Sequence, residues 1–188
     1  MPVSSRRDFL RAAAACACLL ITQPGRAEGI QLSLIEVVQK GELFHLSGHF
    51  DIQLSPSLEN ALQRGVQITF VQTVEGERVR DYWLSEGLVD QERRIRVAYN
   101  ALLRQYYVTV SGVSSSHDTL DDALRAAGDL REWAVLSVKQ MKKKSSYRVQ
   151  VRMQLDLSQL PKPLQVNALS SSGRWQLDSG WQEREFKY

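Results

Sequence analysis

Residues 147–157 have the sequence Tyr147-Arg-Val-Gln-Val-Arg-Met-Gln-Leu-Asp-Leu157, in which apolar and polar side chains alternate without a break. In an extended strand, residues two apart share one face of the sheet. One face of this segment therefore packs against other apolar groups while the other contacts water, as in an antiparallel sheet. The alternation predicts a mostly β protein.

Weaker alternation of the same kind recurs earlier in the chain, at Ile30/Leu32/Leu34, Phe44/Leu46, Val66/Ile68/Phe70, Ile95/Val97/Tyr99 and Tyr106/Val108/Val110. Polar triplets with a central glycine lie between some of these segments, at residues 40–42 (Lys-Gly-Glu) and 75–77 (Glu-Gly-Glu). Because glycine and charged residues are typical of tight turns, both triplets predict hairpins.

Two short helices are expected between the strands. Ser55 is placed to cap the first, with Pro56 at its first position, Gly65 beyond its end, and an apolar stripe of Leu58, Ala61 and Leu62. Thr119, with Asp122 three residues later, predicts the start of the second, whose apolar face is Leu120, Ala123, Leu124 and Ala127.

We predict one antiparallel, sandwich-like domain over residues 28–188 with the two helices at its ends. Leu58-Glu-Asn-Ala-Leu62 resembles Leu120-Asp-Asp-Ala-Leu124, which suggests an internal repeat of two β-β-α-β-β units at about residues 28–86 and 87–157. The alternative is chance, because the matching segments are short.

Residues 158–188 form a tail of different character. Two prolines in residues 160–164 predict a stiff, extended segment, since each proline fixes its own φ and biases the residue before it. Residues 164–168 are expected to form an edge strand. Trp175 and Trp181 indicate that the tail docks on the domain.

Residues 1–27 match a removable twin-arginine signal peptide. Its recognition residues are Ser5, Arg6, Arg7, Phe9 and Leu10, and a short apolar stretch follows at residues 12–21. The small residue Ala27 marks the predicted cleavage site. We therefore expect the twin-arginine export machinery and a signal peptidase as partners, and the periplasm as the location.

Other interpretations of this segment fit less well. Ten mildly apolar residues are far fewer than the about 20 that span a bilayer, so no transmembrane helix is expected. An amphipathic N-terminal helix of a cytosolic protein remains the alternative.

Removal of residues 1–27 changes the composition. The segment holds four of the 24 basic residues and one of the 21 acidic residues, so the remainder has 20 of each and no net charge. The alkaline pI is therefore no argument for nucleic-acid binding, and none is expected. Both cysteines, Cys16 and Cys18, lie in the segment as well. The remaining 161 residues can bury about 70% of their unfolded surface without a disulfide.

No residues are assigned a catalytic, cofactor-binding or metal-ligating role. His45 and His49 are four residues apart, as in some zinc sites, but they flank a strand-and-turn segment and are expected to be ordinary imidazoles. His117 adjoins Asp118 and the serines at 114–116, but neighbours in one loop cannot adopt triad geometry. The pair Asp121 and Asp122 belongs to a helix first turn. No phosphate-binding or dinucleotide motif is present.

Two basic clusters have two interpretations each. Residues 142–144 (Lys-Lys-Lys) are expected at a hairpin tip, and Arg94 and Arg96 on the wet face of a strand. In one interpretation they dock to an acidic partner. In the other, which is favoured, they are solvated surface charges that discourage exposed sheet edges from pairing with other chains. The aromatic residues are expected mostly in the core or in cross-strand pairs.

The chain resembles a family of exported proteobacterial proteins, the domain of unknown function family 4390. The resemblance covers essentially all of the chain after the signal. It rests on Asp81-Tyr-Trp83, Tyr99-Asn-Ala-Leu-Leu-Arg-Gln-Tyr106, Thr119-Leu-Asp-Asp-Ala-Leu124, and most specifically on Leu160-Pro-Lys-Pro-Leu-Gln-Val-Asn-Ala-Leu169 followed by Trp175 and Trp181. The family carries no assigned activity, so the resemblance implies no site residues.

Three hypotheses for function follow. The leading one is an exported periplasmic binding or accessory protein without evident catalytic activity. The second is a periplasmic partner of a membrane sensor kinase, because the resemblance implies genes that often lie near such a kinase. The third is an enzyme or carrier, exported prefolded, that holds a cofactor or metal through His45, His49 and nearby acids.

Overall fold

The computed structural model describes residues 29–80, 84–165 and 177–188. Its elements, in chain order, are β1 (Gly29–Lys40), β2 (Leu43–Gln53), α2 (Pro56–Gln63), β3 (Ile68–Val79), β4 (Glu86–Asn100), β5 (Gln105–Val110), β6 (Val113–His117), α3 (Leu120–Gly128), β7 (Asp129–Ser137), β8 (Ser146–Leu155) and β9 (Gln182–Lys187). Short 3-10 turns follow β7 (Val138–Gln140) and β8 (Leu157–Gln159).

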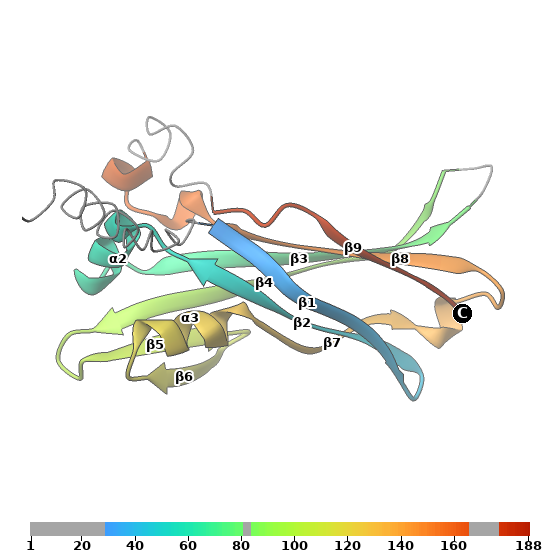
Figure 1. Cartoon of the computed structure of the whole chain (residues 1–188), viewed down its shortest axis with the longest axis horizontal. Helices are drawn as coiled ribbons and strands as arrows, with labels where there is room; N and C mark the ends of the chain where they lie inside the picture. The colour runs from blue at the N-terminus through green and yellow to red at the C-terminus, as the bar shows by residue number, and fades with distance from the viewer. Residues whose placement is uncertain (1–28, 81–83, 166–176) are drawn as a thin grey trace, which may run out of the picture.

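The strands form two antiparallel sheets that face each other. The smaller sheet has the order β1-β2-β7 and the larger one β6-β5-β4-β3-β8-β9. Long strands run the length of the molecule, with α2 and α3 at one end and the C-terminus at the other (Figure 1). The predicted mostly β, sandwich-like fold with two short helices is confirmed, but both helices lie toward the same end (Figure 1). Because the smaller sheet has half as many strands, it cannot cover the whole inner face of the larger one.

The core lies between the sheets and is mostly apolar. Strand β8 shows the alternation expected from its sequence, with Tyr147, Val149, Val151 and Met153 fully buried and the intervening residues half-buried. Phe50 and Leu46 from β2 and Phe70 and Ile68 from β3 are also fully buried in this cluster. Each such side chain contributes about 1.5–3 kcal/mol on burial, which holds the sheets together.

Both helix starts are as predicted. The side chains of Ser55 and Thr119 accept hydrogen bonds from the backbone N–H groups of Leu58 and Asp122, respectively. Helix α3 packs against β2, β4, β5 and β6, so it fills part of the space that the smaller sheet leaves open (Figure 1).

A close backbone contact determines where α3 ends. A Cβ atom on Gly128, the last residue of α3, would lie 1.9 Å from the carbonyl oxygen of Phe50 in β2. Only glycine allows the end of the helix to approach the strand this closely. The chain then continues directly into β7, which pairs with β2.

The hairpin predicted at residues 75–77 is wrong. Gly76 lies inside β3, at a bulge in its pairing with β4, and faces the core. A Cβ atom there would lie 3.4 Å from Val89 and 3.5 Å from Leu136, so the glycine serves close packing between strands. The chain reverses after Val79 instead. The other predicted turn, at residues 40–42, is confirmed, and it joins β1 to β2.

Residues 142–144 do not form a hairpin tip. They are exposed in the connection from β7 to β8, and these strands belong to different sheets. The prediction failed because the alternation in β8 shows which face is buried, not which strand is its neighbour.

The predicted extended segment at residues 160–164 is also wrong, because residues 162–165 form a helical turn. The backbone N–H groups of Leu164 and Gln165 donate to the carbonyl oxygen of Pro161. Prolines fit the first turn of a helix, where their missing N–H groups are not needed. The edge strand predicted at residues 164–168 therefore does not include Leu164 and Gln165, and its remainder lies outside the described residues.

Residues 182–187 dock as expected, since they form β9 and pair with β8. The two predicted repeat units are interleaved, since β7 from the second pairs with β2 from the first. Ser5, Arg6, Arg7, Phe9, Leu10 and Ala27 lie outside the described residues. Within the described part of the chain, no helix has the length and apolar character needed to cross a membrane.

The Gly128 contact gives a stability prediction. The substitution Gly128→Ala should lower the free energy of unfolding by roughly 3 kcal/mol, at the upper end of the range for overpacking, because the methyl group must displace backbone. Urea denaturation followed by circular dichroism measures this change.

Gly87→Ala is the matched control, because a Cβ atom on Gly87 meets no heavy atom within 4 Å. Its unfolding free energy should stay within about 0.5 kcal/mol of the parent value. Equal losses in both variants would contradict the importance of the Gly128 contact.

Candidate functional site

A polar row crosses the inner face of the larger sheet. Gln72 in β3 is fully buried and pairs across the sheet with Arg93 in β4 and Met153 in β8. Nε of Arg93 donates to Oε1 of Gln72 over 2.7 Å, and Nε2 of Gln72 approaches Sδ of Met153 at 3.5 Å. The buried amide thus orients the guanidinium.

Arg93 is held from the opposite sheet as well. Its Nη2 donates to the backbone carbonyl oxygen of Asp129 in β7 over 3.2 Å. The guanidinium carbon lies 4.5 Å from the ring centroid of Trp133, a cation–π contact. All three contacts are to neutral groups, and among the described residues no carboxylate oxygen lies within ion-pairing distance of Arg93. Its positive charge is therefore not compensated by the described part of the protein.

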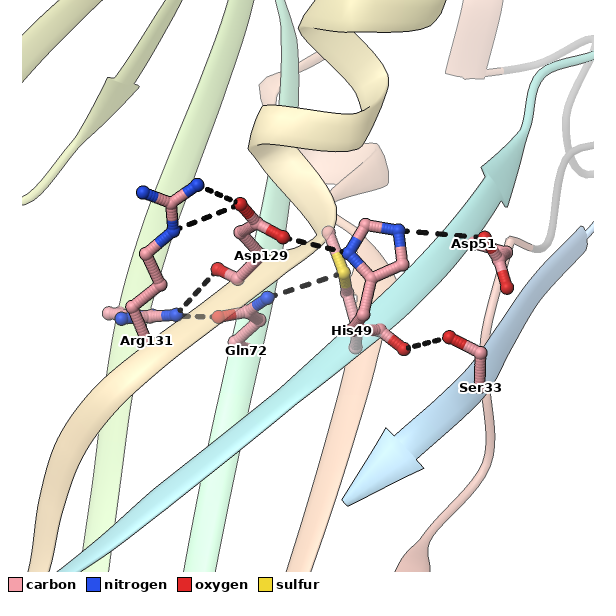
Figure 2. A network of polar contacts seen from close by, with 8 residues as sticks. Ser33, His49, Asp51, Gln72, Asp129 and Arg131 are labelled. Atoms are coloured by element: carbon pink, nitrogen blue, oxygen red, sulfur yellow. Dashed lines mark hydrogen bonds and ion pairs between the residues drawn. The ribbon is translucent and has the colours of Figure 1, made fainter. Parts of the chain in front are cut away.

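Asp129 connects this row to the smaller sheet (Figure 2). Its Oδ1 lies 2.8 Å from Nδ1 of His49, and its Oδ2 accepts hydrogen bonds from Nη2 and Nε of Arg131 over 2.5 and 3.0 Å. Nε2 of His49 lies 3.5 Å from a carboxylate oxygen of Asp51. Asp129 follows Gly128 directly, so the close helix–strand contact places this carboxylate opposite His49 in the β2–β7 pairing.

The electrostatics of the two central groups differ. Burial raises the pKa of Asp129, but the hydrogen bonds and charges of Arg131 and His49 outweigh it, so this pKa lies below its usual value. Burial lowers the pKa of Arg93, although a guanidinium remains charged at neutral pH. The site therefore contains a satisfied carboxylate beside an uncompensated cation.

An open hollow of about 420 Å³ lies beside these groups, on the inner face of β5 and β6 next to Ala126 of α3 and Asp129 of β7. We call it the valine hollow. It is lined by Val108, Val110, Val113, Ser115, His117, Ala126, Arg93, Asp129 and Arg131. A second hollow of about 530 Å³ adjoins it along the edge of β7, and Arg93 and Arg131 line both.

The structure does not bring His45 and His49 together with acids as one metal-binding cluster. His49 contacts Asp129 and Asp51, whereas Nδ1 of His45 is buried without a hydrogen-bond partner. Among residues 29–80, 84–165 and 177–188, no group of three or more His, Cys, Asp or Glu side chains is placed to hold a metal ion.

The loop predicted around His117 is instead strand β6, and its residues do not form a triad with Asp118. Nε2 of His117 lies 2.8 Å from Oγ of Ser115, but Asp118 contacts the side chain of Gln105 instead. Asp122 accepts a hydrogen bond from its capping partner Thr119, which, despite some desolvation, lowers its pKa and fits its helix-start position.

Arg94, Arg96 and most of the described aromatic residues lie as predicted. Arg94 and Arg96 are exposed, and Arg94 pairs with Glu92 over 3.0 Å. Tyr99 and Tyr106 form a ring pair with centroids 4.7 Å apart, whereas Trp181 is 40% exposed and lies over Arg152. Tyr82, Trp83 and Trp175 lie outside the described residues.

Sequence reasoning missed Gln72, Arg93, Asp129 and Arg131 as site residues. The alternation of strand residues could have identified two of them. Arg93 shares a face with Ile95 and Val97, and Gln72 shares a face with Phe70 and Val74. A polar residue on an inward-facing position marks a buried network. No parity argument places Asp129, because its position depends on the pairing of β7 with β2.

Asp129 gives a pH prediction. Its pKa is depressed on folding, so its stabilising effect is present above the unfolded-state pKa of about 3.9 and is lost as the pH falls through the folded-state value. The variant Asp129→Asn should therefore show a flatter loss of unfolding free energy below about pH 4 than the parent. Urea midpoints across this range test it, and parallel pH profiles for the two proteins would refute the role of Asp129.

Comparison with known proteins agrees with the resemblance seen in the sequence. Residues 27–185 match the family model described as a domain of unknown function, DUF4390. No curated protein and no solved structure matches the chain. The match spans both helices and every described strand up to residue 185 in β9, so the chain belongs to the DUF4390 family.

Proposed function

We propose that this protein is an exported binding or accessory module of the periplasm, and that the valine hollow is its ligand site. The observation that carries the proposal is the guanidinium of Arg93, held by neutral groups at the edge of an apolar hollow. A ligand that fits this site combines an apolar group with an anionic head, either a carboxylate or a phosphate.

The charges beside the hollow support an anionic head. Nε and Nη2 of Arg93 are used by Gln72 and Asp129, while Nη1 has no hydrogen-bond partner among the described residues. A guanidinium carries five N–H donors in one plane and binds carboxylates and phosphates well. Arg131 lies beside it with its side chain 84% exposed, so it can turn toward a ligand.

The lining supports an apolar tail. Val108 is buried, whereas Val113 is 75% exposed on the short edge strand β6. An exposed valine beside two others and Ala126 forms an apolar surface that a bound chain would remove from water. The volume of about 420 Å³ lies within the usual range of about 300–1,000 Å³ for small-molecule sites.

Decanoate is a suitable probe of this proposal. It should bind the protein in isothermal titration calorimetry, and the neutral decanamide should bind about tenfold more weakly, because it lacks a charge-assisted hydrogen bond. Arg93→Met should weaken decanoate binding by a similar factor.

Arg96→Met is the matched control, since Arg96 lies on the same strand but is exposed on the outer face. It should leave decanoate affinity unchanged. If Arg93→Met fails to fold, Arg131→Met provides the second test. Equal affinity for the acid and the amide, or equal losses in the Arg93 and Arg96 variants, would refute the assignment of the site.

Export is tested separately. In a bacterium with a twin-arginine pathway, the parent chain should appear in the periplasm with Glu28 as its first residue, as measured by mass spectrometry of the fractionated protein. The variant R6K/R7K should remain in the cytoplasm as the precursor, because a signal receptor distinguishes guanidinium from ammonium groups. Arg11→Lys is the control that keeps export. Periplasmic R6K/R7K protein would show that the arginine pair is not the address.

A further inference from the structure

The connection between β4 and β5 exposes two adjacent leucines. Asn100 and Gln105 are the last residue pair of the two strands, and residues 101–104 form the loop between them. Leu102 is 95% exposed and Leu103 is 60% exposed. Single exposed leucines are common on protein surfaces, but two neighbours at the tip of a hairpin form a small apolar projection.

The loop is held in this shape by its own contacts. Oδ1 of Asn100 accepts hydrogen bonds from the backbone N–H groups of Leu102 and Leu103 over 3.0 and 3.2 Å. Arg104 closes the loop with a φ of 53°, in the left-handed region that non-glycine residues seldom adopt. The leucines are therefore presented by a defined turn.

We propose that residues 101–104 form a membrane-docking tip, which inserts Leu102 and Leu103 among the lipids at the surface of a phospholipid bilayer. A backbone N–H that enters lipid needs a hydrogen-bond partner within the protein, and Asn100 supplies one to each leucine. The paired rings of Tyr99 and Tyr106 lie directly behind the tip, although Tyr106 is largely buried. Tyr107, half-buried on β5, adds a further ring near the depth of the lipid headgroups.

The charges around the tip favour apolar insertion over attraction to anionic lipid. Arg104 is exposed and can extend its guanidinium to a lipid phosphate. Asp118 is exposed and accepts a hydrogen bond from Gln105, the residue after Arg104, so the tip region carries one charge of each sign. Binding should therefore depend on the leucines and only weakly on salt or on phosphatidylglycerol content.

The chain offers a matched control. Leu84 is 91% exposed and precedes β4, whereas Leu102 follows it. A strand of 15 residues extends about 50 Å, so the two leucines lie at opposite ends of the sandwich. Figure 1 shows β4 running from the end near the β3–β4 connection to the end that carries the helices.

The experiment uses the full chain and phosphatidylcholine vesicles, with and without phosphatidylglycerol. In co-sedimentation, L102D/L103D should lower partitioning onto vesicles about tenfold, while Leu84→Asp leaves it unchanged. As a local measurement, Leu102→Trp and Leu84→Trp are each compared with the parent chain in brominated lipids, so that quenching of the four native tryptophans is subtracted. Only the added tryptophan at residue 102 should be quenched beyond the parent.

Quenching at residue 102 alone, with or without phosphatidylglycerol, supports the docking tip. Quenching at neither position, or equally at both, would overturn it. A loss of partitioning on removal of phosphatidylglycerol would also overturn it, since charge attraction would then explain the binding. None of these outcomes bears on the valine hollow, which is tested by decanoate.

Discussion

The close approach of Gly128 to the backbone of Phe50 is the constraint on which the rest of the structure depends. It brings the end of α3 against β2 with no side chain between them. The next residue, Asp129, then pairs with His49 and starts β7 along the edge of β2. Since β7 is held there, the smaller sheet stops short of β5 and β6, and the valine hollow remains open. This one glycine thus allows α3 to approach β2, and thereby positions the start of β7 and the candidate site beside it.

The alternation of residues 147–157 and the capping residues Ser55 and Thr119 made the fold class and both helices predictable. These features are local, because a strand's parity or a helix cap depends on a few neighbouring residues. Gly76 and the helical turn after Pro161 were misinterpreted because glycine and proline each suit more than one backbone context. Strand partners were not predictable, since a strand can present the same buried face to several neighbours.

The candidate site was also predictable only in its local features. Inward-facing positions of Gln72 and Arg93 follow from strand parity, but their meaning depends on what lies across the core. Trp133 and the carbonyl group of Asp129, which contact Arg93, belong to β7, 36 or more residues after Arg93 in the chain. Even a half-buried guanidinium such as that of Arg93 costs stability unless its donors are satisfied. Gln72 and the backbone carbonyl group of Asp129 accept hydrogen bonds from Arg93, and the ring of Trp133 packs against its guanidinium. Nη1 of Arg93 is left available to a ligand.

The strands of the two sheets alternate along the chain, since β7 of the smaller sheet lies in sequence between β6 and β8 of the larger one. This order affects how fast the chain can fold. His49 and Asp129 are 80 residues apart in sequence, and Glu77 and Arg148 are 71 apart, so both sheets close through distant pairs. Proteins dominated by such non-local pairing fold in about milliseconds to seconds, much slower than helical bundles. During that interval β2 presents an unpaired edge that can aggregate with other chains. Under the proposed twin-arginine export, which carries proteins that have already folded, this slow closure would be completed before translocation rather than after it.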